Sequence, residues 1–110
     1  MIETTIKDYL DTALVGIPIR LEIPKNMPEK FVVLHIIDRG RDNFIESVTM
    51  EFDSYADSKY EAAVLDESLR EAIDTMNETS DISCKFSGGD DSNDTTYKKY
   101  RYRCYYNLYY

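Results

Sequence analysis

The stretch FVVLHIIDRGRDNFIESVTMEFD, residues 31–53, decides the fold because it holds two strand patterns separated by a polar turn. Residues 31–37 are almost continuously apolar, which is typical of a central strand that is covered on both faces or lies near a helix. Residues 38–43 contain Gly40 and charges of both signs but no apolar side chain, so they indicate a hairpin tip. Residues 44–53 alternate between apolar and polar, which predicts a strand with one buried and one hydrated face.

Apolar residues at helical spacing flank this hairpin on both sides. Residues 4–14 are predicted to form a helix because the apolar side chains from Ile2 to Leu14 recur every four residues. Ser58 precedes Glu61 by three residues, the spacing of a capping box, and begins a second helix that continues to about Asn77. The other face of this second helix is predicted to be solvated and carries Glu61, Asp66, Glu67, Arg70, Glu71 and Asp74.

The remaining segments complete an α+β pattern. Residues 17–23 alternate as a strand. Because proline donates no ladder hydrogen bond, the prolines that bracket this strand predict that it lies at a sheet edge or has its N–H side turned outward at its ends. Residues 82–86 form a short strand, residues 87–96 a polar loop, and residues 97–110 a long terminal strand. We therefore expect one domain over residues 1–110, with two helices packed on one face of a mostly antiparallel sheet of about five strands.

Composition excludes several classes of protein. In 110 residues, 43% hydrophobic and 31% charged residues are ordinary globular usage, which argues against a disordered chain. The net charge of -8 repels nucleic acid and anionic lipid, so neither sequence-specific DNA binding nor membrane binding is expected. The first residues lack the basic-then-apolar order of a signal peptide, and synthesis in the cytoplasm is expected. Cys84 and Cys104 are expected to be reduced thiols, with a cross-strand disulfide as the alternative.

The residues with the chemistry for catalysis or metal binding form no recognised motif. His35 is the only histidine, and its place inside an apolar strand favours a structural role over that of a catalytic base. The two cysteines and one histidine lack a zinc spacing. Residues 90–96 carry oxygen ligands at alternate positions, but a calcium loop would need a glycine at its sixth position and a glutamate where Arg101 stands. We therefore predict no catalytic residue, no metal and no cofactor, and we do not expect an enzyme.

The C-terminal strand is basic in an acidic chain. Residues 97–110 carry a net charge of +4, from Lys98, Lys99, Arg101 and Arg103. Because the net charge of the whole chain is -8, residues 1–96 carry a net charge of -12. The interleaved tyrosines and arginines could stack on single-stranded bases and bind phosphates. We favour the alternative of an amphipathic core strand whose basic face lies at an interface between subunits. Its inward face would then hold Tyr100, Tyr102, Cys104, Tyr106 and Leu108.

Four segments carry a resemblance that spans nearly the whole chain. They are PEKFVVL at residues 28–34, RGRDN at 39–43, SYADSKYEAA at 54–63 and TTYKKYRYRCYYNLYY at 95–110. Together they resemble the small tail terminator or tail completion (neck) proteins of long-tailed bacteriophages. The resemblance implies a ring, usually a hexamer, that caps the head-proximal end of the tail tube and ends its polymerisation. It also implies three partners, namely further copies of the chain, the tail tube protein and the head-tail connector protein, and a location in the virion neck.

Two alternatives remain open beside this interpretation. Minor capsid and head-tail connector proteins have a similar size and element order, and a small phage-encoded regulatory binding protein is also compatible with the chain. In a closed ring each subunit offers two different patches, head to tail, and we expect opposite charges to meet there or at the tail tube. The candidate interface residues are Arg39, Arg41 and Asp42 on the hairpin, Asp90, Asp91 and Asp94 on the polar loop, and Arg101 and Arg103 on the terminal strand.

Overall fold

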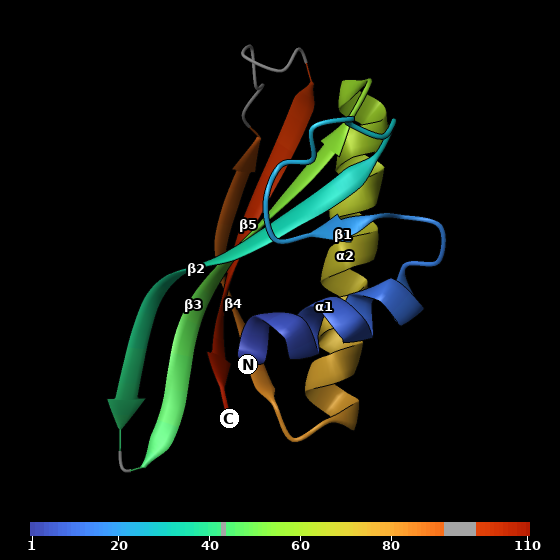
Figure 1. The fold of residues 1–110 in the computed structure, drawn as a ribbon. Helices are drawn as coiled ribbons and strands as arrows, with labels where there is room; N and C mark the ends of the chain where they lie inside the picture. Colours follow the sequence, from blue (N-terminus) through green and yellow to red (C-terminus); the bar gives the residue numbers. More distant parts are fainter. Residues whose placement is uncertain (43, 92–98) are drawn as a thin grey trace.

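The computed structural model describes residues 1–42, 44–91 and 99–110, and Figure 1 shows their arrangement. In chain order the elements are α1 (Ile2–Ala13), β1 (Ile19–Arg20), β2 (Phe31–Asp42), β3 (Ile45–Ala56), α2 (Lys59–Thr79), β4 (Ser83–Asp91) and β5 (Tyr100–Tyr109). The strands form one sheet in the order β1-β2-β3-β5-β4, in which β1 is parallel to β2 and all other neighbours are antiparallel. The predicted α+β class and the order of helices and strands are confirmed.

Both helices pack on the same face of the sheet. α1 contacts β1 and β2, whereas α2 contacts β3, β4 and β5, so the two helices divide the sheet between them. Burying each large aliphatic side chain in this layer stabilises the fold by about 1.5–3 kcal/mol. The main core contains Ile6 and Leu10 from α1, Leu69 and Ile73 from α2, and Val32, Leu34, Met50, Phe52, Cys104 and Tyr106 from the sheet.

The opposite face of the sheet is covered only in part. The connection between β1 and β2 crosses this face, where Ile23 and Met27 pack against a second small core of Phe31, Val33 and Tyr55. The rings of Phe31 and Tyr55 stack there with centroids 4.7 Å apart. The start of β2 is therefore buried on both faces, as its apolar run predicts.

The helix α2 begins as predicted but buries part of its acidic face. The Ser58 hydroxyl accepts a hydrogen bond from the Glu61 N–H at 3.1 Å, which is the predicted cap. The prediction that Asp66 and Arg70 are solvated is wrong, because β4 and β5 lie beside this turn of the helix. Asp66 is buried with its carboxylate 3.0 Å from Arg70 Nε, and the Arg70 guanidinium stacks 4.7 Å from the Phe86 ring centroid.

Several strand boundaries also differ from the predictions. β2 continues to Asp42, so most of the expected hairpin tip is strand, because β3 supplies partners for its backbone groups as far as Ile45. β4 continues to Asp91 through residues predicted to be loop, since β5 pairs with them. β1 is at the sheet edge as predicted, but it has only two residues. The rest of the predicted loop, residues 92–96, lies outside the described residues.

A substitution at Gly89 of β4 can test how closely α2 and β5 pack against this strand. A Cβ at this position would lie 2.6 Å from Arg70 Nη2 and 2.7 Å from the backbone oxygen of Arg103. The guanidinium can move, but the strand backbone cannot move without disturbing the β4–β5 ladder. We predict that Gly89→Ala lowers the free energy of unfolding by about 1–3 kcal/mol, measured by urea denaturation. Ser87→Ala, at an exposed position of the same strand, is the control and should change it by less than about 0.5 kcal/mol. Equal stability of the two variants would contradict the prediction.

Candidate functional site

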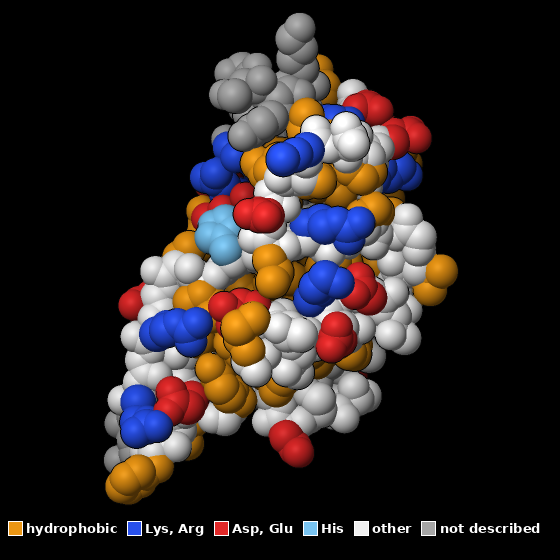
Figure 2. Space-filling model, viewed as in Figure 1, with side chains coloured by type: hydrophobic (Ala, Val, Ile, Leu, Met, Phe, Trp, Pro, Cys, Tyr) orange, Lys and Arg blue, Asp and Glu red, His pale blue; other side chains and the backbone are white. Residues whose placement is uncertain are grey.

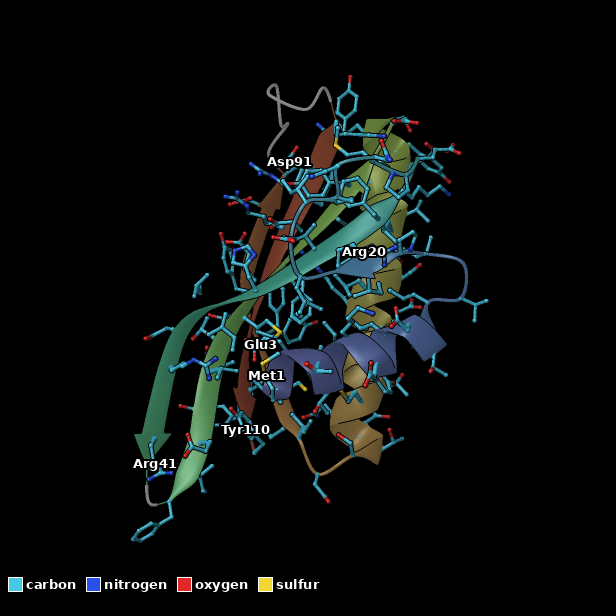
Figure 3. All side chains as sticks on the ribbon, in the orientation of Figure 1. Met1, Glu3, Arg20, Arg41, Asp91 and Tyr110 are labelled. Atoms are coloured by element: carbon cyan, nitrogen blue, oxygen red, sulfur yellow. The ribbon has the colours of Figure 1, made fainter. Side chains whose placement is uncertain are left out.

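The predicted interface residues fall into three separate places. Figure 3 shows Arg41 at the free end of the β2–β3 hairpin and Asp91 at the opposite end of the sheet. The hairpin and the end of β4 are therefore not brought together within one chain. The third place is the face of the sheet away from the helices, which carries Arg101 and Arg103 of β5. The side chain of Asp42 and the whole of Asp94 lie outside the described residues.

A bulge in β2 sets the direction of the hairpin arginines. The register with β3 shifts between Ile36 and Asp38, which leaves Ile37 as an extra residue in β2. One extra residue exchanges the two faces of everything that follows it in a strand. Arg39 is thereby turned to the helix side of the sheet, where its Nη2 lies 3.5 Å from Glu3 Oε2 of α1.

The hairpin tip exposes apolar side chains next to a charged pair. Phe44 is 94% exposed and Ile45 is 50% exposed. Phe44 has a backbone φ of +67°, a left-handed conformation that costs a bulky residue on the order of 1–3 kcal/mol. Beside it, Arg41 Nε donates to Glu46 Oε1 at 2.7 Å. Such an exposed ion pair is worth less than about 1 kcal/mol, so both charges can change partner easily.

A groove lies between α1 and α2. It has a volume of about 510 Å³, and the Tyr9 hydroxyl joins the two helices by donating to the Ala72 carbonyl at 3.0 Å. Val64 of α2 remains 43% exposed in this groove. Its apolar lining includes Tyr9, Leu14, Val15, Ile17, Val64, Leu65 and Ala72, and the charged residues that line it are Lys30, Glu61 and Glu71.

The far face of the sheet holds a buried charged cluster of His35, Glu51, Asp53 and Arg103. The β2–β3 register places His35 opposite Glu51, and the β3–β5 register places Asp53 opposite Arg103. His35 Nε2 lies 3.2 Å from Glu51 Oε2, and Arg103 Nε lies 3.5 Å from that oxygen and 3.3 Å from Asp53 Oδ1. Figure 2 shows the only histidine, in pale blue, among acidic and basic side chains.

The cluster corrects the prediction that this face of β3 is hydrated. Glu51 is only 7% and Asp53 only 4% exposed, because the β1–β2 connection and the arginines of β5 close over them. Burial, together with the neighbouring Glu51, raises the pKa of Asp53 to about 7, although the positive charges of Arg103 and Arg101 oppose this shift. An acidic pair on one strand face is visible in the sequence, but the partners that bury it depend on strand register.

The same cluster contains a donor set that can bind a divalent cation. His35, Glu51 and Asp53 each offer one ligand atom, and these atoms lie within 4.8 Å of one another. Spacing along the sequence does not reveal this set, because its members come from the two strands β2 and β3. However, the Arg103 guanidinium already lies between the two carboxylates and supplies positive charge there. We therefore describe the group as an ion-pair cluster and assign no metal to it.

The basic residues of β5 are engaged with the sheet. Arg103 belongs to the charged cluster, and Arg101 Nη1 lies 3.3 Å from the Tyr55 hydroxyl oxygen with its guanidinium 5.9 Å from that ring centroid. Both arginines are half-buried. The inward face is confirmed for Cys104, Tyr106 and Leu108, which are buried in the main core.

Comparisons with known proteins add no family to this description. No protein-family model matches the chain, and no curated protein matches it significantly. Neither of the helices within the described residues is long and apolar enough to span a lipid bilayer.

The raised pKa of Asp53 predicts a dependence of stability on pH. Between pH 4 and about pH 7 the folded state keeps a proton that the unfolded state releases, so the free energy of unfolding falls as the pH rises through this window. Asp53→Asn removes this contribution. We predict that the fall in unfolding free energy from pH 5 to pH 8 is about 2 kcal/mol smaller in Asp53→Asn than in the wild type. The measurement is urea denaturation at the two pH values, in buffer containing a chelator.

Asp81→Asn serves as the control for this experiment. Asp81 is exposed, so its side chain is hydrated in both states and its pH profile should run parallel to that of the wild type. A parallel profile for Asp53→Asn as well would show that the cluster does not hold the proton.

Proposed function

We propose that the protein is a structural virion component that assembles into a ring of identical copies at the head-proximal end of a phage tail. There it ends polymerisation of the tail tube and offers a surface for joining the head. The sequence resemblance suggests this role, and the observation that best supports it is the β2–β3 hairpin, which extends beyond the end of β5 and exposes Phe44 at its tip (Figure 1).

The sheet edges support assembly as well. β1 pairs with β2 only at Val32 and Val33, so among the described residues the outer side of β2 from residue 34 to residue 42 has no neighbouring strand. β4 likewise ends the sheet on the other side within the described chain. Unpaired N–H and C=O groups along such edges are sites at which further chains add. A protein with two open edges and an apolar hairpin tip is suited to contacts with other subunits.

The two ends of the molecule differ, which favours a ring over a symmetric dimer. The hairpin carries Arg39 and Arg41 among acidic residues, namely Asp38, Asp42 and Glu46, whereas the opposite end of the sheet carries Asp90 and Asp91 (Figure 3). Contacts between unlike surfaces run head to tail, and they close into a ring when the rotation between neighbours allows it. That these opposite charges meet between subunits or at the tail tube stays a prediction.

The nucleic-acid alternative receives less support than assembly. A single-strand binder needs arginines and aromatic rings free to meet phosphates and bases. Arg103 instead contacts two carboxylates, and Arg101 lies against Tyr55. A minor capsid or connector protein would use the same hairpin on a different partner, and a small regulatory protein would remain a monomer or dimer.

The proposal predicts the mass of the assembled protein. Sedimentation velocity over increasing concentration, alone and with the tail tube protein, should show a discrete species larger than a dimer, and electron microscopy should show closed rings at tube ends. The six copies usual in the resembled family are the expected number. A mass no greater than a dimer under every condition, including with the tail tube protein, would contradict the proposal.

A further inference from the structure

The described surface includes two apolar features, namely the hairpin tip and the groove between α1 and α2. We propose that the hairpin tip of one copy, centred on Phe44, inserts into the α1–α2 groove of the next copy. The inference rests on the proposed function, because it names the contact by which neighbouring subunits of the ring hold each other.

The tip has the properties of an inserted element. Phe44 and Ile45 are exposed, and Figure 2 shows hydrophobic side chains at the outermost point of the hairpin. The positive φ of Phe44 is a left-handed backbone conformation, which is unfavourable for a residue with an aromatic side chain. Burial of this aromatic ring by a partner would offset the free-energy cost of the strained backbone and of the exposed side chain.

The groove has a complementary apolar surface. It presents Val64 from α2 and Val15 from the connection that follows α1, and both remain exposed in the single chain. Leu65 and Ala72 are buried beneath them and also line the groove. An aromatic ring is the type of anchor that such an apolar groove between helices accepts.

The charges around the two features are also complementary. Among the tip side chains that the structure describes, Arg41 and Glu46 carry opposite charges and pair with each other at the surface. The groove carries Glu61 and Glu71 for the arginine and Lys30 for the glutamate. Exchanging one exposed ion pair for two such pairs costs little and fixes the direction of insertion.

A second copy is the occupant that the arrangement favours. Figure 1 shows the free end of the β2–β3 hairpin on the opposite side of the molecule from the helices α1 and α2, whose residues line the groove, so a chain does not reach its own groove. Each copy supplies one tip and one groove, so in a closed ring every groove can be filled by the tip of a neighbouring copy. Because the tip and the groove are different surfaces, the contact is head to tail and propagates around a ring.

The experiment uses cysteine cross-linking between full-length single variants. A mixture of Phe44→Cys and Val64→Cys should give a disulfide-linked dimer under mild oxidation, because inserted side chains come within the Cβ separation of about 4 Å that a disulfide needs. The native Cys84 and Cys104 are buried and serve as an internal background. Phe44→Cys mixed with Glu78→Cys is the control, since Glu78 is exposed on α2 but lies outside the groove lining, and it should give at least tenfold less product.

A second pair of variants measures assembly directly. Val64→Arg should weaken self-association at least tenfold in sedimentation velocity, whereas Glu78→Arg should assemble like the wild type. Circular dichroism and thermal midpoints of both variants verify that they fold. Val64→Arg that is folded and assembles normally would overturn the inference.

The outcomes separate this inference from the proposed function. If the wild-type protein forms rings but positions 44 and 64 do not cross-link, the groove contact is overturned and the proposed ring is supported. Cross-linking of Phe44→Cys to the tail tube protein instead of Val64→Cys would also overturn it. Cross-linking between copies that never exceed a dimer would support the contact and contradict the ring. Absence of both cross-linking and assembly would overturn both.

Discussion

The antiparallel ladder between β2 and β3 is the interaction on which the rest of the molecule depends. It runs from Phe31 opposite Tyr55 to Asp42 opposite Ile45, and it joins the helix-covered body to the hairpin. Its single irregularity, beside Ile37, reverses which face the later residues occupy. If the same residues paired without this bulge, Arg39 would lie on the face away from α1 and could not contact Glu3. One inserted residue in the ladder therefore decides both the contact of the hairpin with the body and the direction of its charges.

The same ladder creates the buried charges on the far face. Alternation places Glu51 and Asp53 on the face away from the helices, where hydration would be the default. The β1–β2 connection crosses that face, so the carboxylates lose water and meet Arg103 instead. Breaking such a buried pair by removing one partner costs more than forming it gains, because the remaining charge is left desolvated. We therefore expect the cluster to contribute more to the choice of strand register than to the free energy of unfolding.

Local patterns predicted the parts of the fold that depend on neighbours in sequence. Helical spacing and the Ser58 cap identified α2, and alternation identified β3, because each is set by residues a few positions apart. The burial of Asp66 and the assembly of the His35 cluster depend on which elements lie across the sheet, and spacing along one segment does not contain that information. The hairpin length was missed for a related reason. The charged residues 38–42 were predicted to form the hairpin tip, although the backbone pairing of β2 with β3 continues through them.

The position of the hairpin relative to the helices connects the fold to assembly. The helix layer stabilises β2 and β3 by burying side chains from residue 32 onward, but it gives nothing to the exposed Phe44 and Ile45. An isolated hairpin is only marginally stable in water, so burial of the tip by a partner would stabilise it. A left-handed aromatic residue costs the free chain energy that contact with a partner can offset. Under the proposed assembly, we therefore expect association to stabilise the end of the molecule that the core leaves exposed.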